Sequence, residues 1–495
     1  MLAYTMEIPW VSVWEASLTL AVILSTLFTI VMFTLPSGHD HFLPDEMKDS
    51  DFTEEDKNDS DRSGYSYFQK HKNAKGVLTV KSSVQVVVLG DIGRSPRMQY
   101  HALSIANHGG LVQLVGYYES EIHPDIMASR MISVVPIPSF PFRTSNRLLF
   151  LLLAPFKVLW QFQALYHALG YRTNAARWML VQNPPSIPLL VVARIICSIR
   201  TTRLVVDWHN FGYSILSLRL GPDHLLVKIS EWYEGYFARG AAAHFAVTNA
   251  MCRVLKQKWN IDALPLHDRP AKHFQPTTRK QQVEFLQTLP SLQDAKNTDL
   301  ENRSWKLIVS STSWTPDEDF SILLDALVEY SAAKEQKQSL PKIWAIITGK
   351  GPLKEHYERR IQKLGEAQKL NNVTITTAWL SIEGYASLLG SADLGVSLHT
   401  SSSGVDLPMK VVDMFGAGLP VVGWSKFEAW PELVKEGENG HGFESAGDLA
   451  RTLQELFGGD GRELAELKQG ALRECERRWE DEWLPVAGKL FRLDR

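Results

Sequence analysis

The chain has 495 residues, of which 45% are hydrophobic and 22% are charged, and its formal net charge at pH 7 is −3. This length exceeds the size at which one hydrophobic core keeps growing, so we expect two domains of ordinary size with additional segments. The balanced charge gives no electrostatic reason to expect a nucleic-acid partner. The three cysteines, Cys197, Cys252 and Cys475, are widely spaced, which indicates buried thiols and neither a metal site nor a disulfide framework.

The amino-terminal segment is long and apolar. From Ala16 to Leu35 about twenty residues carry no charge, and as a helix rising about 1.5 Å per residue they would cross a hydrocarbon layer about 30 Å thick. We expect a transmembrane anchor within residues 1–36, because a cleaved signal peptide would have a basic region before the apolar stretch. The distribution of Lys and Arg near the ends of this helix weakly favours an orientation in which the carboxyl-terminal side is cytosolic. Sequons at Asn58, Asn302 and Asn372 would accept glycans on a luminal chain.

The next segment, residues 37–82, is polar and poor in aliphatic side chains. It cannot bury enough surface to offset the entropy of ordering, so we expect a flexible linker. The run from Val84 to Leu89 is apolar and β-branched and ends at Gly90, which is typical of a strand buried in a parallel sheet. Further short strands are expected at Leu111–Val115, Trp178–Val181, Arg203–Val206 and Phe245–Thr248, with helices at Leu189–Ser198 and Leu225–Phe237. Alternating strands and helices predict a doubly wound α/β domain over residues 83–276.

A second series of the same kind follows a polar stretch at residues 277–303, an interdomain or surface loop. It predicts a second α/β domain over residues 304–470. We expect the closing segment, residues 471–495, to be helical and to cross back to the first domain. The strands of the second domain are expected at Leu307–Ser311, Ile343–Thr348, Val373–Thr377, Leu394–Leu398 and Val421–Trp424. Two such domains create a cleft at the carboxyl ends of both sheets, where open α/β sheets bind ligands.

The loop after the first strand, from Gly90 to His101, has the form of an anion site. Its glycines let the backbone approach a ligand closely, and Arg94 and Arg97 can each fork onto a phosphate at the start of a helix. The alternative is an ordinary strand-to-helix turn with solvated arginines.

A polar and aromatic string, Val206 to Tyr213, follows another predicted strand. Asp207, His209 and Asn210 can hydrogen-bond sugar hydroxyls, while Trp208, Phe211 and Tyr213 can offer flat apolar faces to a sugar ring. A second interpretation stays equally open, in which His209 is a packing residue and the aromatic side chains are core.

Two loops of the second domain carry charged residues. Asp317-Glu318-Asp319 spells the Asp-x-Asp metal signature, but it lies after Pro316 and just before a helix, where acidic residues complement the helix dipole, so we expect a capping role. Lys350 lies between Gly349 and Gly351 at the end of a strand. It could reach a nucleotide phosphate, or the segment could be a plain turn.

The string from Ser401 to Val422 is the strongest local feature. It combines a Ser/Gly loop, Pro408 at a helix start, Lys410, and Asp413 just over one turn into the helix. Phosphate could bind the loop amides and the helix terminus, while Asp413 could accept hydrogen bonds from ribose hydroxyls. The alternative is a loop followed by an amphipathic helix with incidental acids.

Four strings in order resemble the chitobiosyldiphosphodolichol β-mannosyltransferase family, the first mannosyltransferases of N-glycan assembly: Val86–Ala102, Val206–Ser214, Leu266–Phe274 and Ser401–Pro420. The resemblance implies a GT-B fold, with two Rossmann-like domains facing a cleft. It also implies an inverting enzyme that moves mannose from GDP-mannose to dolichyl-diphosphate chitobiose at the cytosolic face of the endoplasmic reticulum membrane. Other lipid-linked oligosaccharide mannosyltransferases are expected partners. No tightly bound cofactor is implied, and a divalent cation such as Mg²⁺ is compatible with the sequence but not indicated by it.

The resemblance also suggests residue roles. Asp91 is the first candidate for the catalytic base, His209 the second and His101 the third. The expected acceptor-binding residues are Arg94, Arg97, Asp207 and Asn210, and the expected donor-binding residues are Lys350, Ser403, Gly404, Lys410 and Asp413. Two departures limit how far residue roles can be carried over from retaining GT-B families. Val405 stands where they carry the first of two glutamates, and Ser313 to Asp317 stands where they carry an Arg and a Lys.

A lipid acceptor requires access to a membrane. The apolar run from Leu148 to Phe156 continues through Trp160 and Phe162 and has basic neighbours, which suits an interfacial helix, although a buried core helix is the alternative. Two other functions remain: a different lipid-linked GT-B sugar transferase, and an inactive membrane scaffold that retains the fold.

Overall fold

The computed structural model describes residues 80–142, 147–289, 305–315, 318–336 and 340–494, and before them residues 17–23, 25–26, 47–51, 53–58, 69, 72 and 75–78. The chain divides into two compact units. The first unit contains Met1–Val181 and Ile187–Leu204, and the second contains Gln182–Ser186 and Val205–Arg495.

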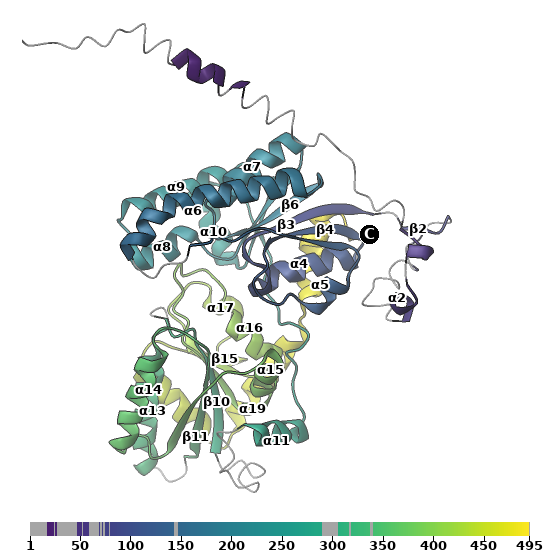
Figure 1. The fold of residues 1–495 in the computed structure, drawn as a ribbon. Coiled ribbons are helices and arrows are strands. Elements are labelled where there is room, and N and C mark those ends of the chain that lie inside the picture. Colours follow the sequence, from purple (N-terminus) through teal and green to yellow (C-terminus); the bar gives the residue numbers. More distant parts are fainter. Residues whose placement is uncertain are drawn as a thin grey trace, which may run out of the picture. The chain divides into compact units, whose positions relative to one another are not determined.

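A seven-stranded sheet has the strand order β5-β4-β3-β6-β7-β8-β9 (Figure 1). Strand β3 pairs in parallel with both β4 and β6, so the strand order reverses at β3, the position where open α/β sheets place their ligand sites. The strands are β3 (Ser82–Asp91), β4 (Gly110–Tyr117), β5 (Ile132–Pro136), β6 (Trp178–Asn183), β7 (Arg203–Trp208), β8 (Ala243–Ala246) and β9 (Leu264–Pro265).

The helices of the first unit bury apolar faces. In α4 (Pro96–Asn107) a proline at the first turn starts the helix, and Met98, Ala102 and Ile105 are fully buried. The others are α5 (Pro124–Ala128), α6 (Arg147–His167) with its π-helical end (Ala168–Arg172), and α7 (Leu189–Arg200). A small two-stranded sheet pairs β1 (Met47–Lys48) antiparallel with β2 (Val77–Leu78), and α2 (Glu54–Asn58) lies between these strands in the chain.

In the second unit, four helices follow the strands of the first sheet: α8 (Gly212–Leu220), α9 (Leu225–Ala238), α10 (Asn249–Trp259) and α11 (Arg279–Thr288). The amino terminus of α10 shows how the sequence fixes one of these ends. Thr248 caps the helix, because its hydroxyl accepts a hydrogen bond of 3.0 Å from the backbone N–H of Met251.

A six-stranded parallel sheet forms the other half of the second unit, in the order β12-β11-β10-β13-β14-β15. Its strands are β10 (Trp305–Ser311), β11 (Lys342–Thr348), β12 (Val373–Ala378), β13 (Leu394–Ser397), β14 (Val421–Trp424) and β15 (Gly440–Phe443). The helices between them are α13 (Phe320–Gln336), α14 (Lys354–Glu366), α15 (Ile382–Ser391), α16 (Met409–Gly416), α17 (Trp430–Leu433) and α18 (Ala446–Gly458).

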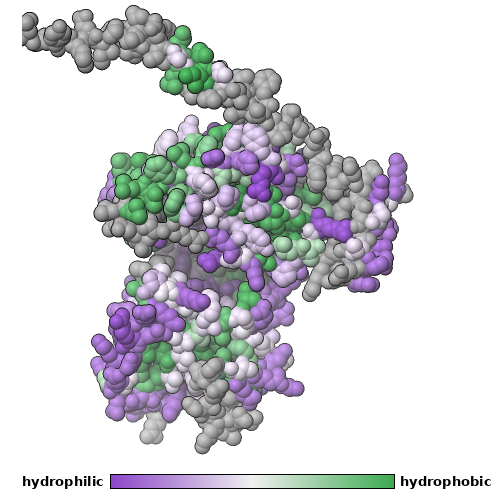
Figure 2. Space-filling view, in the orientation of Figure 1, coloured by the Kyte–Doolittle hydropathy of each residue, from purple (hydrophilic) through white to green (hydrophobic). Residues whose placement is uncertain are grey.

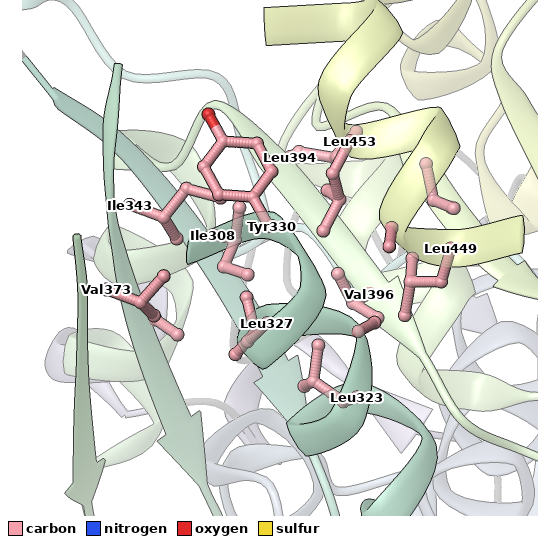
Figure 3. Packing of buried hydrophobic residues seen from close by; sticks show 14 of the residues in the cluster. Ile308, Leu323, Leu327, Tyr330, Ile343, Val373, Leu394, Val396, Leu449 and Leu453 are labelled. Atoms are coloured by element: carbon pink, nitrogen blue, oxygen red, sulfur yellow. The ribbon is translucent and has the colours of Figure 1, made fainter. Parts of the chain in front are cut away.

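The core beneath this sheet joins α13, α18 and the strands. Figure 3 shows Leu323 and Leu327 of α13 beside Val396 of β13, with Leu449 of α18 on the far side of the cluster. All four side chains are fully buried, and each contributes about 1.5–3 kcal/mol relative to an exposed position. This packing fixes the sheet whose carboxyl edge carries the candidate donor residues.

The chain ends in α19 (Arg462–Glu476), α20 (Trp479–Trp483), a π-helical turn (Leu484–Gly488) and α21 (Lys489–Phe491). The ring of Phe491 packs edge-on against Phe245 of β8, with 6.1 Å between the ring centroids. The end of the chain therefore lies against a strand of the seven-stranded sheet.

The expected amino-terminal transmembrane helix is not supported. Within the described part of the chain, no helix is both long and apolar enough to cross a bilayer. Of the span expected from Ala16 to Leu35, only residues 17–23 and 25–26 are described, and these are helical. The rest of that span lies outside the described residues.

Candidate active site

Asp91, the last residue of β3, is engaged in holding a neighbouring loop. Its Oδ1 accepts hydrogen bonds from the backbone N–H groups of Glu119 (3.0 Å) and Ser120 (3.2 Å). Burial alone would raise its pKa, but the hydrogen bonds from Ser120 and Glu119 outweigh burial and hold the pKa below its usual value. Asp91 is therefore a weaker base than an unengaged carboxylate would be.

The other candidate residues of the first unit differ in their exposure to solvent. Arg94 extends into solvent, with 82% of its side chain exposed, and its Nε lies 3.5 Å from Oδ2 of Asp91. Arg97 and His101 face the other way on α4, where Arg97 is 3% exposed and His101 is fully buried. Of these side chains, Arg94 is the one placed to reach a ligand from solvent.

The turn after β7 forms an acid–imidazole pair. Nε2 of His209 lies 2.8 Å from Oδ2 of Asp207, and Asp207 is fully buried. A buried carboxylate in this position orients the imidazole ring and stabilises the imidazolium form once it arises. His209 keeps 23% of its side chain exposed, so the pair has the orientation and access that proton abstraction requires.

The aromatic residues around this pair belong to the core. Trp208 is fully buried and Phe211 nearly so, and both rings pack against Trp259. Tyr213 also packs against Trp259 and lies beneath Nζ of Lys258, 4.2 Å from its ring centroid. Of the two interpretations left open by the sequence, core packing therefore holds for these aromatic side chains, while Asp207, His209 and Asn210 form polar contacts apart from them.

Asn210 joins this turn to the Ser/Gly loop of the second sheet. Its Nδ2 donates hydrogen bonds of 3.1 Å to both Oγ of Ser402 and Oδ2 of Asp406. Asp406 also accepts from Nε2 of His399 at 3.1 Å and from the hydroxyl of Ser401. Burial would raise the pKa of Asp406, but His399 and Ser401 hold it below the usual range.

The sequence interpretation gave no role to Asp406 or His399. Asp406 lies inside the Ser/Gly string, and His399 directly follows the strand expected at Leu394–Leu398, two residues after the end of β13. A polar residue just past a strand end in a parallel sheet is the signal that would have identified His399.

The Ser/Gly loop is held by its own side chains. Its backbone takes positive φ at Ser401 (57°) and Gly404 (75°). The N–H of Gly404 donates to Oγ of Ser401 at 2.7 Å, and the N–H of Val405 donates to Oγ of Ser403 at 3.4 Å. The Gly404 amide, expected to bind phosphate, is therefore engaged within the loop in this structure.

Lys410 forms an ion pair with Glu318, which is 5% exposed. Glu318 also accepts hydrogen bonds from the hydroxyl of Thr312 (3.0 Å) and the hydroxyl of Ser313 (2.8 Å). Burial would raise its pKa, but Lys410 and Ser313 lower it below the usual value. This ion pair connects the loop after β10 to the first turn of α16.

The capping role expected for Asp317-Glu318-Asp319 is only partly right. Asp319 does cap α13, because its Oδ1 accepts from the backbone N–H of Ser321 at 3.0 Å. Glu318 instead turns inward to Lys410, since a partly buried ammonium requires a counter-charge. Asp317 lies outside the described residues.

Asp413 lies in an acidic environment within the second unit. Burial and the nearby charge of Asp268 raise its pKa to about 7, with Lys410 acting in the opposite direction. Beside Asp268, Arg269 is 7% exposed and pairs with both Glu474 and Glu482 at 2.5 Å. Among the residues that the structure describes, no group of three or more His, Cys, Asp or Glu side chains could hold a metal ion.

Lys350 stacks on an exposed tryptophan. Its Nζ lies 3.9 Å from the ring centroid of Trp379, which is 63% exposed at the end of β12. The flanking glycines are required by close approach, because a Cβ at Gly349 would lie 1.8 Å from the carbonyl oxygen of Thr312. The segment is therefore a tight turn that presents a cation at the carboxyl edge of the sheet.

Comparison with known proteins identifies the family. Residues 306–458 match a family model described as glycosyl transferases group 1. A chitobiosyldiphosphodolichol beta-mannosyltransferase of Arthroderma benhamiae is 51% identical over 382 residues, which cover 76% of this chain and 85% of that protein. A protein of Arabidopsis thaliana named UDP-glycosyltransferase TURAN is 41% identical over 457 residues, covering 82% of this chain and 96% of that protein.

The solved structures agree on the fold. Anabaena HepE in complex with UDP and glucose superposes with a TM-score of 0.57 at 17% sequence identity, covering 83% of this chain and 99% of that chain. This likeness confirms the expected GT-B fold with two parallel sheets. The sequence relatives confirm the resemblance stated from the four strings. The chain therefore belongs to the chitobiosyldiphosphodolichol beta-mannosyltransferase family.

Proposed function

We propose that this chain transfers mannose from GDP-mannose to dolichyl-diphosphate chitobiose with inversion, forming a β-1,4-mannosyl linkage. Family membership supports the substrates. The observation that carries the proposal is the link from Asn210 to Ser402 and Asp406. It ties the turn that bears the Asp207–His209 pair directly to the loop expected to hold the donor.

His209 is the base that the geometry favours. In a single displacement, His209 removes the proton from the acceptor 4-hydroxyl as that oxygen bonds to the anomeric carbon of mannose. The bond from this carbon to the diphosphate oxygen breaks, and GDP leaves with the electron pair. Asp207 holds the ring and its 2.8 Å hydrogen bond offsets the charge that His209 gains.

Departing GDP requires positive charge near its phosphates. Lys410 is held by Glu318 at the first turn of α16, where the helix amides add partial positive charge. Lys350 adds a second cation at the same edge of the sheet. Ser403, Gly404 and Asp413 complete the proposed donor set, and the Gly404 amide must exchange its bond to Ser401 for the phosphate.

Membrane association is the second part of the proposal, with the catalytic halves at the cytosolic face of the endoplasmic reticulum and the amino terminus as an anchor. The exposed apolar side chains of α6 support it: Leu152 is 70% exposed, Phe156 64% and Leu159 66%. Their spacing of four and three residues places them on one helix face. Figure 2 shows hydrophobic surface, drawn in green, in the region where Figure 1 draws α6, α8 and α9.

The deciding assay measures radioactive mannose transfer to a synthetic lipid-diphosphate chitobiose. GDP-mannose should support turnover, and UDP-sugars should not. Turnover with a UDP-sugar alone would support the different transferase suggested by the name of the Arabidopsis relative. Absence of turnover with every donor would support the inactive scaffold. An endoglycosidase-induced shift of the chain on a gel would contradict the cytosolic placement.

A further inference from the structure

A fully buried carboxylate lies behind the turn that carries the Asp207–His209 pair. Glu234 of α9 is 0% exposed. Its Oε1 accepts hydrogen bonds from the backbone N–H of Gly212 at 2.8 Å and from Oγ of Ser186 at 3.0 Å. Gly212 is the first residue of α8, directly after Asn210 and Phe211. Glu234 therefore fixes the end of the turn through a backbone atom.

The approach between these two residues is too close for another side chain. A Cβ on Gly212 would lie 2.4 Å from Oε1 of Glu234. Gly212 is not among the residues with positive φ, so backbone conformation does not explain the glycine. The close contact with the Glu234 carboxylate explains the glycine instead.

Asn183, the last residue of β6, holds the same turn from the other side. Its carbonyl oxygen accepts a hydrogen bond of 2.8 Å from the backbone N–H of His209. Its side chain is fully buried and lies close enough to Glu234 to favour the ionised carboxylate. A buried polar side chain costs stability unless it has a partner, so the contacts that Asn183 and Glu234 make to the turn offset the cost of burying them.

We propose that Glu234 is a positioning residue for the transfer reaction: by holding Gly212 and Ser186, it sets the orientation of the turn that carries Asp207, His209 and Asn210. The inference rests on the proposed function, since it concerns the same base. Small displacements of such a base are costly, because proton transfer requires hydrogen-bond distance to the acceptor hydroxyl.

The ionised carboxylate is the form that performs this role, because it accepts every hydrogen bond offered. Burial raises the pKa of Glu234 to about 7, although Ser186 and the backbone of Gly212 favour the ionised form. The cation of the adjoining helix is already paired. Lys258 of α10 lies 2.6 Å from Glu231 and 3.0 Å from the hydroxyl of Tyr213, and within the described part of the chain Glu234 forms no ion pair.

The experiment uses the full chain with GDP-mannose and a synthetic lipid-diphosphate chitobiose. Glu234→Gln keeps an acceptor for Gly212 but cannot ionise, so above pH 7 it should lower kcat, though by less than Glu234→Ala does, and its difference from the wild type should narrow below pH 7, where the wild-type carboxyl is also protonated. Glu234→Ala should lower kcat by about 10²-fold, a larger effect than its effect on KM for GDP-mannose. Glu231→Ala, on the same helix, is the matched control and should leave kcat unchanged.

Two outcomes are decisive. Equal kcat in wild type and Glu234→Ala, with only a lower melting temperature, would overturn the inference and leave Glu234 a structural residue. If Glu234→Ala does not fold, Glu234→Asp provides the same comparison, because the shorter side chain cannot reach both Gly212 and Ser186. Failure of the wild type to turn over GDP-mannose would contradict the proposed function itself, a result distinguishable from failure of the positioning role.

Discussion

Nδ2 of Asn210 lies 3.1 Å from Oδ2 of Asp406, although 196 positions separate the two residues in the chain. The contact brings the β7 turn and the Ser/Gly loop into one cluster within the second unit. Asp406 also binds His399 and Ser401, and Thr248 and Ser214 contact the same loop at Val405 and Ser402, so displacement of Asn210 would remove one of several contacts that hold the loop.

Asn210→Ala should therefore weaken donor binding. The variant leaves buried Asp406 with fewer donors and lets the Ser/Gly loop move, so we expect KM for GDP-mannose to rise about tenfold, the effect of losing one hydrogen bond to a charged group. Steady-state kinetics with both substrates measures this. Ser217→Ala, on the neighbouring helix α8, is the control. Equal KM for the variant and wild type would show that the loop does not depend on Asn210.

The choice of base is testable with three substitutions. His209→Ala removes the proposed base and Asp207→Asn removes the charge that orients it, so each should lower kcat by about 10²–10⁴-fold. Asp91→Asn should lower kcat less, because the Asp91 carboxylate is already engaged by two backbone amides. Single-turnover rates at saturating substrate separate these cases. Near-normal turnover of His209→Ala, with a large loss in Asp91→Asn, would reverse the assignment.

Most of the strands were predictable, because buried parallel strands are continuous β-branched runs. The expected runs at Val84–Leu89 and Ile343–Thr348 fall within β3 and β11. Two of the strands that the sequence did not reveal break this pattern. β15 contains two glycines in its four residues, and β9 has only two residues; their pairing is imposed by neighbouring strands, which no local pattern encodes.

The polar contacts of the site were less predictable than the strands. That Lys410 lies at a helix start was visible from the sequence, but its partner Glu318 is 92 positions away and resembled a helix cap. Likewise, the burial of His101 depends on which face of α4 packs inward. Motif strings place residues at a sheet edge, whereas their partners depend on tertiary packing.

Glu432 supplies a pH-dependent contribution to stability. It accepts hydrogen bonds from the backbone N–H groups of Asn249 and Ala250, both at 2.7 Å, and from His267 at 3.0 Å. Burial would raise its pKa, but His267 and these amides lower it to about 2. The folded pKa lies below the unfolded one, so the stabilisation is complete above about pH 4.5 and is lost as pH falls toward 2.

Glu432→Gln should therefore reduce the free energy of unfolding by at most about 3 kcal/mol at pH 7, with the difference from wild type shrinking below pH 4.5. Urea denaturation at several pH values measures it. Glu428→Gln is the control, since Glu428 is half exposed and pairs with an exposed arginine, where an ion pair contributes little. A difference in unfolding free energy that persists unchanged to pH 3 would show that protonation of Glu432 does not cause the pH dependence.

The apolar face of α6 predicts membrane binding that does not require the amino-terminal segment. Phe156→Ser together with Leu159→Ser should lower vesicle partitioning about tenfold or more in a chain lacking residues 1–82, because burying each side chain contributes about 1.5–3 kcal/mol. These positions are better probes than Trp160 or Phe162. Trp160 donates to the carbonyl of Pro138, and Phe162 stacks on Tyr166, so changing either would also disturb packing.

The matched control for this measurement is Trp379→Ser, which removes an equally exposed aromatic side chain from the second unit, 63% exposed against 64% for Phe156. Flotation of the chain with liposomes should fall for the α6 variant and stay unchanged for the control, while melting temperatures of both match the parent. If both variants float like the parent, α6 is a solvent-exposed helix with no membrane role. If both lose binding equally, adhesion is a general property of exposed aromatic residues and not of this face.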